Sequence, residues 1–386
     1  MATIKRAIYL VLFAVAAPYF YDRYLAFSNI VANGPGKLEP VYAFSSHELK
    51  FTDKLKNCED LILHEELGIA FLSCDPGRDR WNTVMGHFHT PRLSQPQGTI
   101  WVYNYASTPD TITPLSFINF PREDDFHPLG ILFDPKTSRL YVINHSRHSG
   151  SVIEIFELSL TNHTATHVQT LSHPLLHTPN SMEILDSGNL LVTNDHYLRA
   201  AVSPALSKIE TFSGIPGGTI VSISPSSPET AKILARVSFA NGIAKLNETT
   251  IVVASSAKPG LYIYHLTPTG DFELAKFVRT PSGPDNLSVD AHGKVLIAGH
   301  PYVPTLMQVA EGRWKCDEDG TEEERRACGC WAGSWVGEWS EEEGVRTLLK
   351  AGGGEVCSSS SAVRDVGRGI GMVSMLYGRG LVVFRE

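Results

Sequence analysis

A short phrase recurs along this chain of 386 residues. In each copy, a residue with a carboxylate or amide side chain opens a strand-like run, a polar turn follows, and a second strand-like run comes after. The copies are CEDLIL with GIAFL from Cys58, GILFDPKTSRLYVINH (the weakest) from Gly130, NSMEILDSGNLLVTND from Asn180, NGIAKLNETTIVVAS from Asn241 and DNLSVDAHGKVLIAGH from Asp285. If these hairpins are arranged in a ring, their oxygen-bearing residues converge on one axis.

The spacing of the copies predicts the fold class. They begin near residues 59, 130, 180, 241 and 285, and a sixth unit can be drawn through residues 358–361 and 369–373 to 381–384. Short apolar runs fill the chain, and no helical pattern of convincing length follows the N-terminus. Units of this length built only from strands are typical of four-stranded propeller blades. We therefore predict an all-β protein, a six-bladed β-propeller over residues 28–386, in preference to a β-sandwich, which offers no reason for the recurrence.

The first 27 residues have the pattern of a targeting segment. Lys5 and Arg6 precede an apolar run at residues 7–17, and the small residues at 14–16 suit a cleavage site. The apolar run is short for a membrane span, which needs about 20 residues. We predict a signal peptide or an uncleaved signal anchor at residues 1–27, with a buried N-terminal helix as the alternative. The propeller would then enter the secretory pathway and be secreted, or be held at a membrane on the luminal or extracellular side.

The cysteines and glycosylation sequons agree with an oxidising compartment. Cys58 and Cys74 are symmetric about the turn at residues 65–66, so they face each other in the predicted hairpin and we expect them to pair. The other four lie in or near a polar insertion at about residues 311–345, where disulfides are favoured over a zinc site because the spacing fits no common zinc pattern: Cys316, Cys328, Cys330 and Cys357. Three sequons are candidate glycan sites: Asn144, Asn162 and Asn247.

Composition and motifs disfavour several functional classes. The formal net charge is −8, and there is no basic stripe or long block of Lys and Arg, so a nucleic acid is not an expected partner. The chain has no G-x-S-x-G nucleophile elbow, which argues against a serine hydrolase. It also lacks the P-loop and the glycine fingerprint of dinucleotide-binding proteins.

The residues that open the strands suit a calcium ion. Calcium takes about six to eight oxygen ligands and accepts carboxylates, amides and backbone carbonyls, whereas zinc and copper prefer nitrogen and sulfur. Asn and Asp are also common in turns, so any one of these residues alone has a structural explanation. Four copies in phase favour a shared metal site instead. The candidate ligands are Glu59, Asp60, Asn180, Asn241, Asp285 and Asn286, and the repeats alone do not separate Glu59 from Asp60.

Four of the phrases resemble the paraoxonase/arylesterase family. They are CEDL from Cys58, TNDHY from Thr193, FANGI from Phe239 and DNLSVD from Asp285, and they run in the family's order between about residues 40 and 305. The C-terminal part of the chain matches poorly. The resemblance implies a six-bladed propeller with two calcium ions in its channel, one catalytic and one structural. It also implies hydrolysis of lactones and aryl esters, and of organophosphates by some members.

Carried over by position, the resemblance assigns ligands to both ions. The catalytic calcium is assigned to five residues that the repeats select independently: Glu59, Asn180, Asn241, Asp285 and Asn286. The structural calcium is assigned to Asp60 and the backbone carbonyl of Ile131. The family has an aspartate at the position of Ser181, so one carboxylate ligand of this second ion is lost. The second ion is therefore expected to bind weakly, to recruit water in place of the lost ligand, or to be absent.

The family's pair of catalytic histidines is incomplete in this chain. His145 stands in the matching Asn-His phrase, whereas the other position is occupied by Leu129. A histidine lies two residues earlier, at His127; on a strand this shift keeps the same face but moves the side chain by about 7 Å. We take His145 and His127 as the candidate catalytic residues. His196 and His300 are expected near the mouth of the channel, in structural roles.

These observations predict a calcium-dependent hydrolase of small lactones or aryl esters, in which the metal polarises a carbonyl that activated water attacks. His145 is the first candidate for the base, with Glu59 or Asp285 in its place if the histidine pair has been lost. The main alternative is a non-catalytic calcium-binding propeller that binds a partner, which Leu129 and Ser181 favour. A propeller similar to sugar lactonases or strictosidine synthase, which share the architecture, is the related enzymatic alternative.

Overall fold

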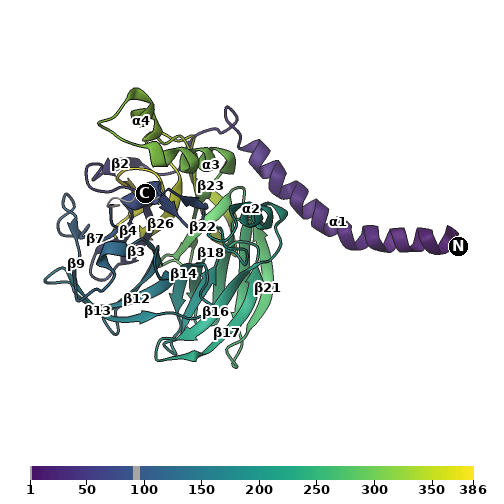
Figure 1. Ribbon diagram of the computed structural model, residues 1–386, viewed down its shortest axis with the longest axis horizontal. Helices are drawn as coiled ribbons and strands as arrows, with labels where there is room; N and C mark the ends of the chain where they lie inside the picture. Colours follow the sequence, from purple (N-terminus) through teal and green to yellow (C-terminus); the bar gives the residue numbers. More distant parts are fainter. Residues whose placement is uncertain (1, 90–95) are drawn as a thin grey trace.

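The computed structural model describes residues 2–89 and 96–386, and it confirms the six-bladed β-propeller (Figure 1). Six sheets follow one another along the chain, each built mainly from successive strands. The innermost strand of each sheet contacts the innermost strands of the sheets before and after it, and the last contacts the first, which closes the ring. The sixth unit drawn from the sequence is therefore a true blade.

The first three blades occupy the N-terminal half of the ring. Blade 1 contains β3 (Cys58–His64), β4 (Ile69–Cys74), β7 (Thr99–Tyr103) and β8 (Thr113–Pro114). Blade 2 contains β10 (Pro128–Asp134), β11 (Arg139–Ser146), β12 (Gly150–Ser159) and β13 (Thr164–Leu171), with β9 (Ser116–Ile118) at its edge. Blade 3 contains β14 (Pro179–Ile184), β15 (Leu190–Asn194), β16 (Gly218–Ser224) and β17 (Ser227–Val237). A short ribbon of β5 (Trp81–Asn82) and β6 (His87–Phe88) lies between β4 and β7 in the sequence.

The last three blades include strands from both ends of the chain. Blade 4 contains β18 (Ala240–Asn247), β19 (Thr250–Ser255), β20 (Gly260–Leu266) and β21 (Phe272–Arg279). Blade 5 contains β22 (Gly283–Val289), β23 (Val295–His300), β24 (Ser334–Ser340) and β25 (Gly344–Ala351), extended by β1 (Val41–Tyr42). Blade 6 contains β26 (Ser359–Asp365), β27 (Ile370–Met375) and β28 (Leu381–Arg385), and its outer strand is β2 (Ser46–Lys50). Because β2 pairs with β28, the two ends of the propeller sequence are tied together in one blade.

The hydrophobic core is divided among the spaces between neighbouring blades. Each of six clusters of buried side chains joins two successive sheets. Leu72 of blade 1 belongs to one cluster with Met372 of blade 6, whereas Phe71, its neighbour on β4, belongs to another with Phe156 of blade 2. Successive side chains of a strand point to opposite faces. Both faces of the blades are therefore buried, which holds the innermost strands in fixed positions around the channel.

A β-bulge interrupts the first residues of all six innermost strands. The register shifts between Cys58 and Asp60 in β3, and at corresponding points of the other five strands, within residues 128–131, 179–182, 240–243, 284–287 and 359–361. A bulge bends its strand and re-aims the side chains that it carries. The structural feature behind the repeated phrase is therefore the bulge, and every residue predicted to hold the catalytic ion lies in one.

Two helices that the sequence analysis did not identify lie over one end of the channel. They are α2 (Pro204–Ser213), after β15, and α3 (Val303–Gly312), after β23, so the expectation of no convincing helix after the N-terminus was wrong. The sequence signals that indicate these helices are local capping residues. Ser203 caps α2 by accepting a hydrogen bond from Leu206 N, and Gly214 ends it in a left-handed conformation. Helices this short carry too few turns for a distinct apolar periodicity.

The polar insertion is shorter than the predicted 311–345. It holds η3 (Arg313–Lys315) and α4 (Glu322–Ala327), but its last part is β24, which belongs to blade 5. Two further short helical turns, η1 (Pro76–Asp79) and η2 (Glu123–Asp125), lie in the connections before β5 and β10. Trp335 and Trp339 of β24 are buried in the core, whereas Trp314 and Trp331 of the insertion are exposed.

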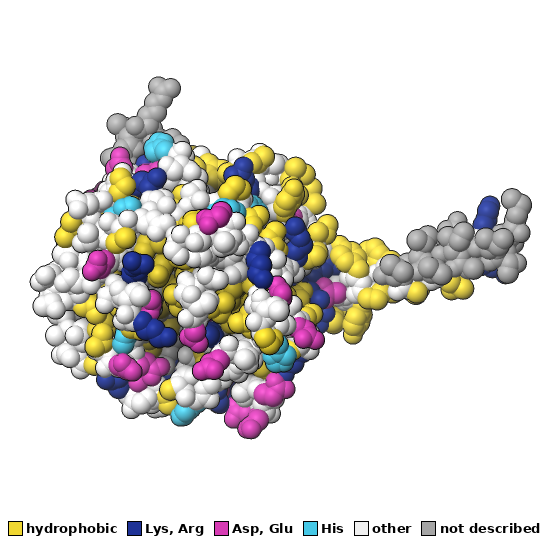
Figure 2. Space-filling view, turned by 90° about the horizontal axis from the view of Figure 1, so that it is seen from below, with side chains coloured by type: hydrophobic (Ala, Val, Ile, Leu, Met, Phe, Trp, Pro, Cys, Tyr) yellow, Lys and Arg dark blue, Asp and Glu magenta, His cyan; other side chains and the backbone are white. Residues whose placement is uncertain are grey.

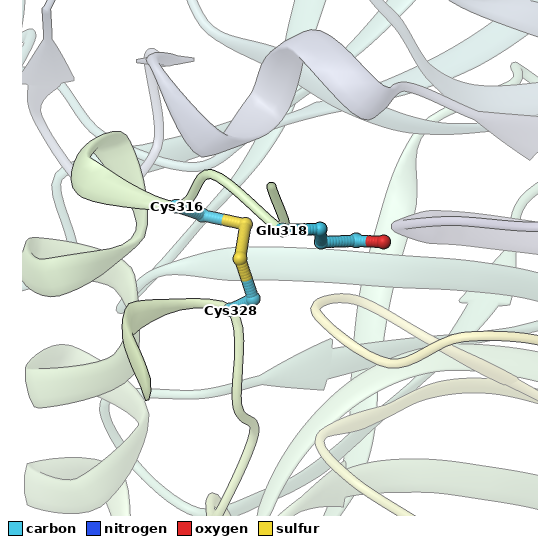
Figure 3. Close-up of side chains that lie close together, drawn as sticks. All are labelled: Cys316, Glu318 and Cys328. Carbon is cyan, nitrogen blue, oxygen red and sulfur yellow. A yellow bond between two sulfur atoms is a disulfide. The ribbon is translucent and has the colours of Figure 1, made fainter. Parts of the chain in front are cut away.

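All six cysteines form disulfides, as predicted. Cys58 pairs with Cys74 across the hairpin of β3 and β4. The polar insertion is braced by Cys316–Cys328 and by Cys330–Cys357. Glu318 lies close to the first of these bridges (Figure 3), but the two sulfur atoms are bonded to each other and do not form a metal site.

The N-terminal segment is a single helix, α1 (Ala2–Ala32), which runs through the boundary expected at residue 27 and extends away from the propeller (Figure 1). Its last turns pack on blades 4 and 5: Arg23 donates to Ala257 O at 2.8 Å, and Asn29 donates to Thr280 O at 3.1 Å. Hydrophobic side chains cover α1 where it leaves the propeller (Figure 2). Among the described residues, no helix combines the length and apolar character that a bilayer crossing requires.

Two of the three sequons are accessible. Asn162 lies exposed in the turn between β12 and β13, and Asn247 is exposed at the end of β18. Asn144 is fully buried: its side chain accepts a hydrogen bond from His127 N at 2.8 Å and donates one to Asp125 O at 3.2 Å. Asn144 cannot carry a glycan in this fold, so that part of the prediction was wrong.

Candidate functional site

Five strand-opening side chains meet at one end of the channel. Glu59, Asn180, Asn241 and Asp285 line the same pocket. Asn286 joins them because its Nδ2 donates to Glu59 Oε1 at 3.0 Å, and Asn241 Nδ2 donates to Asp285 Oδ1 at 2.7 Å. All five are buried, with exposed fractions between 2% and 6%. The fold therefore brings together the set that the repeats select.

The oxygen atoms of this cluster have few partners. Within the described part of the chain, no group donates a hydrogen bond to Glu59 Oε2 or to the Oδ1 atoms of Asn180, Asn241 and Asn286. A buried polar atom without a partner costs about 1–3 kcal/mol, so four such oxygens in one cluster favour a bound cation. Amide and carboxylate oxygens are the ligands that calcium prefers. The residues present therefore fit a calcium ion.

The electrostatics of the cluster also favour a bound cation. Burial raises the pKa of the Glu59 carboxyl well above its usual value, and the nearby charges of Asp60 and Asp285 raise it further. Burial also raises the pKa of Asp60. Without a positive charge between them, these carboxylates repel one another in a region of low dielectric. A proton or a divalent cation relieves the repulsion, so the two compete for this site.

Asp285 has a second partner, His300, at the end of β23. His300 Nε2 lies 2.9 Å from Asp285 Oδ2. Because the carboxylate oxygen accepts, we assign the proton of the neutral ring to Nε2, which leaves the lone pair on Nδ1. No described residue forms a hydrogen bond with His300 Nδ1, and His300 lines the pocket. This position suits proton transfer, beyond the structural role expected from the sequence.

The pocket above the cluster is roofed by α2 and α3 and has mainly apolar walls. Its empty volume is about 980 Å³, part of it open to solvent. The apolar walls come from Val84, Met85, Phe212, Leu306, Met307 and Leu376, and the cationic residues Arg78 and Lys208 also line it. Sites for small molecules typically combine apolar walls with a few polar groups in this way.

These pocket walls do not follow from the repeated phrase, because they lie in connections between strands. Arg78 belongs to η1, Lys208 and Phe212 lie on α2, and Met307 lies on α3. The helix cap at Ser203 and the prolines that begin both helices were the signals that could have located α2 and α3. Their place over the channel depends on tertiary structure, which the repeated phrase does not contain.

His145, the first candidate for the base, is not among the described residues that line the pocket. Its Nε2 lies 2.8 Å from Pro179 O, and its Nδ1 contacts Thr83 Oγ1, so both ring nitrogens have partners. Burial lowers the pKa of His145 to about 4. The ring is therefore neutral at physiological pH and holds β14 against β11 and the segment at Thr83.

His127, the second candidate, also lies outside the pocket lining. Its Nδ1 lies 3.0 Å from Asp75 Oδ2, and its Nε2 lies 3.7 Å from Asp125 Oδ1. Leu129, which occupies the family's histidine position, does line the pocket. The two-residue shift thus places His127 between two aspartates, and Leu129 presents a hydrocarbon surface to the site.

The side chains assigned to a second, structural ion lack the unpartnered oxygens of the first cluster, and Ser181 supplies no carboxylate. Asp60 lies with Ile131 and Ser181 around a different pocket, farther along the channel. Asp60 Oδ2 accepts a hydrogen bond from Ile131 N at 2.8 Å, and Oδ1 accepts from Leu61 N at 2.8 Å and from Ser361 Oγ at 2.9 Å. Both carboxylate oxygens are therefore held by donors. Ile131 offers Asp60 its N–H group, and hydrogen bonds connect the strands where the family is expected to use a metal.

Comparisons with known proteins agree with this architecture. A family model described as Arylesterase matches residues 97–313, more than half of the chain. Serum paraoxonase/lactonase 3 of Oryctolagus cuniculus is 27% identical over 299 residues, which cover 76% of this chain and 79% of that protein. Serum paraoxonase/arylesterase 2 of Canis lupus familiaris is 28% identical over 182 residues, which cover 46% of this chain and 49% of that protein.

Solved structures show the same fold. A gluconolactonase from Xanthomonas campestris matches with a TM-score of 0.51 at 13% identity, and the match covers 92% of each chain. At this identity the likeness concerns the propeller alone, whereas the family follows from the sequence match over residues 97–313. The chain therefore belongs to the arylesterase family and is a carboxylic ester hydrolase.

Proposed function

We propose that this enzyme is a calcium-dependent hydrolase of lactones and aryl esters. The observation that carries the proposal is the group of unpartnered oxygens from Glu59, Asn180, Asn241 and Asn286 at the base of a mainly apolar pocket. A pocket of this kind accommodates a lactone ring or an aromatic leaving group. Relatives named paraoxonase/lactonase and paraoxonase/arylesterase support the same substrate class.

One ion is proposed, held by the five buried residues of the cluster: Glu59, Asn180, Asn241, Asp285 and Asn286. When bound, calcium supplies a Lewis acid that polarises the ester carbonyl and stabilises the oxyanion that develops. The chain's contribution is to hold the ligands on bulges of well-packed strands and to shield the site with α2 and α3. A second ion at Asp60 and Ile131 is not part of the proposal, because Ser181 supplies no carboxylate there and neither Asp60 oxygen lacks a hydrogen-bond partner.

His300 and Asp285 are proposed to activate the water. The lone pair on His300 Nδ1 takes a proton from the water as the water oxygen bonds to the carbonyl carbon, and Asp285 stabilises the resulting imidazolium through Nε2–H. The ester C–O bond then breaks, and the proton moves from Nδ1 to the leaving alkoxide. His145 and His127 are less suited to this step, because neither lines the pocket: both nitrogens of His145 have partners, and the His127 ring lies between Asp75 and Asp125.

A non-catalytic calcium-binding propeller is the second candidate. The observation that favours it is Leu129, which lines the pocket where the family resemblance places a histidine. Such a protein would keep the ion for stability and use the pocket to bind a partner. Turnover separates the two candidates.

In the presence of calcium, the purified protein is expected to hydrolyse γ- and δ-lactones and phenyl acetate. A chelator should abolish this activity, because the oxyanion loses its stabilising charge, and added calcium should restore it. Acid release in a pH-stat measures lactone hydrolysis, and phenol absorbance measures hydrolysis of the aryl ester. Calcium binding without turnover across the panel would support the second candidate, and activity that resists the chelator would contradict the calcium site.

We also propose that the propeller acts in or beyond the secretory pathway, with residues 1–27 as a signal peptide or signal anchor. Three disulfides and two exposed sequons support this location. Protein secreted from a eukaryotic host is expected to lose mass when an N-glycosidase is added. The Asn162→Gln and Asn247→Gln double variant should show no such loss. Recovery of a reduced, unglycosylated protein from the cytosol would contradict this placement.

A further inference from the structure

Arg78 is a buried cation in the wall of the pocket. Arg78 is 5% exposed and lines the pocket together with Glu59 and Asn180. Arg78 Nη2 donates to Pro128 O at 2.9 Å, whereas Nε has no hydrogen-bond partner among the described residues. No described carboxylate lies within ion-pair distance of this guanidinium, which has five N–H donors to satisfy.

The acidic residues next to Arg78 in the sequence have other partners. Asp79 pairs with Lys56 at 2.7 Å and with Arg313 at 2.9 Å. Asp75 pairs with His127 at 3.0 Å, and its other oxygen accepts a hydrogen bond from Gly77 N, which caps η1. These contacts fix the turn that carries Arg78, so its position in the pocket wall is set before any ligand binds. Such preorganisation lowers the entropic cost of binding.

A buried charge without a partner destabilises a protein, because the charged group has lost its hydration and gained no counter-charge. Glu59 shares the pocket with Arg78, but it is a ligand in the proposed metal cluster. Glu59 and Asp285 together match the charge of one calcium ion, so Arg78 stays uncompensated when the ion is bound. Lys208 on α2 lines the same pocket and adds a second positive charge. The loaded pocket therefore carries a net positive charge.

We propose that Arg78 binds a carboxylate carried by the substrate, so that the preferred substrates are lactones or esters with a second, ionised carboxyl group. The inference rests on the proposed hydrolase function and specifies its substrate class. A planar guanidinium matches a carboxylate through two parallel hydrogen bonds. The apolar side chains of Met85, Leu306 and Met307 line the rest of the pocket and suit the hydrocarbon part of such a substrate.

The test compares two substrates that differ only in charge, a γ-lactone with a ring carboxylate and its carboxamide. The unchanged enzyme is expected to prefer the carboxylate by about tenfold or more in kcat/KM, mainly through KM, since a hydrogen bond to a charged group contributes about 1.5–3 kcal/mol. Arg78→Met should bring the ratio of the two kcat/KM values close to one, and Arg78→Lys should restore part of it. Arg80→Met is the matched control, because Arg80 lies two residues away and is not among the lining residues, and it should keep the wild-type ratio.

An unchanged ratio of the two kcat/KM values in Arg78→Met would overturn the inference. If both values also fell by the same factor, Arg78 would have a structural role. The carboxylate of the hydrolysed product is another source of the same chemistry. If Arg78→Met relieved inhibition by the product of a neutral lactone but left the substrate ratio unchanged, Arg78 would be a product site and the substrate inference would fail.

Binding of glutarate separates this inference from the hydrolase proposal. Calorimetry in the presence of calcium should detect glutarate binding to the unchanged protein and a loss of about tenfold or more in affinity in Arg78→Met. This result with no turnover of any ester would reject the hydrolase proposal while supporting the anion site. Ester turnover combined with equal glutarate affinity in the unchanged protein and in Arg78→Met would support the hydrolase proposal and reject the anion site.

Discussion

An Asp285→Asn variant is expected to hydrolyse lactones with a kcat/KM lower by about 10³-fold or more, since general-base catalysis alone contributes about 10²–10⁴. Asp285 accepts a hydrogen bond from Asn241 Nδ2 at 2.7 Å and holds His300 Nε2 at 2.9 Å. Asparagine keeps the shape of the side chain but removes the negative charge. The variant therefore loses a charged ligand of the ion and the group that stabilises the His300 imidazolium.

Calcium titration separates these two contributions. If Asp285 served only to bind the ion, saturating calcium would restore kcat; we expect kcat to stay low, because His300 has lost its partner. Asp271→Asn is the matched control, since it neutralises a carboxylate that is 60% exposed in the connection between β20 and β21 of blade 4, and it should leave the activity unchanged. Normal turnover by Asp285→Asn would reject the assigned site.

Two histidine variants identify the base. His300→Gln is expected to lower kcat about 10²-fold or more, with little loss of calcium affinity, because His300 is not a proposed ligand. His145→Gln is expected to lower thermal stability more than kcat, since both nitrogens of the buried ring contact Thr83 and Pro179. The reverse result would return the catalytic role to His145, as the family resemblance implies.

The ring and the ligand cluster could be predicted because the sequence repeats the element that builds them. Each copy of the phrase marks the bulge at the start of an innermost strand, and a propeller places corresponding positions of successive blades around one axis. Glu59 and Asn286 are 227 positions apart and hydrogen-bonded. No local sequence pattern predicts a contact between residues so far apart, but the repeated phrase does, because it places both at the start of innermost strands.

The histidines could not be placed by the same reasoning. The expectation that His127 shares a face with Leu129 assumed regular alternation, but β10 begins at Pro128 and its register shifts between Pro128 and Ile131. His127 therefore precedes the strand and turns to Asp75. The contact of His300 with Asp285 was not predicted, for a related reason. The register that pairs His300 with Gly283, and so brings it to Asp285, belongs to the second strand of the blade, which the phrase does not specify.

Calcium is expected to raise the melting temperature by more at pH 8 than at pH 5.5. In the metal-free protein, burial and the charges of Asp60 and Asp285 raise the pKa of Glu59, so the folded state holds this proton more tightly than the unfolded chain. That contribution to stability is complete below the pKa of an unfolded glutamate, about 4.3, and is lost as the pH rises through the raised pKa of the folded state. The metal-free protein should therefore melt at a lower temperature at pH 8. Calcium binds the deprotonated carboxylate, so its stabilising effect grows over the same range.

Scanning calorimetry with calcium and with a chelator at both pH values measures this coupling; at a calcium concentration 1,000 times Kd the stabilisation is about 4 kcal/mol. Glu59→Gln removes the titrating group and should eliminate most of the pH dependence and of the calcium effect. Glu66→Gln, in the exposed turn of the same hairpin, should change neither. Titration calorimetry should give one tightly bound ion per chain, because the group around Asp60 has no unpartnered carboxylate oxygen and carries Ser181 in place of a second carboxylate. Two tight ions would contradict the hydrogen-bonded arrangement at Asp60, and a calcium effect independent of pH would contradict the role of Glu59 as a ligand.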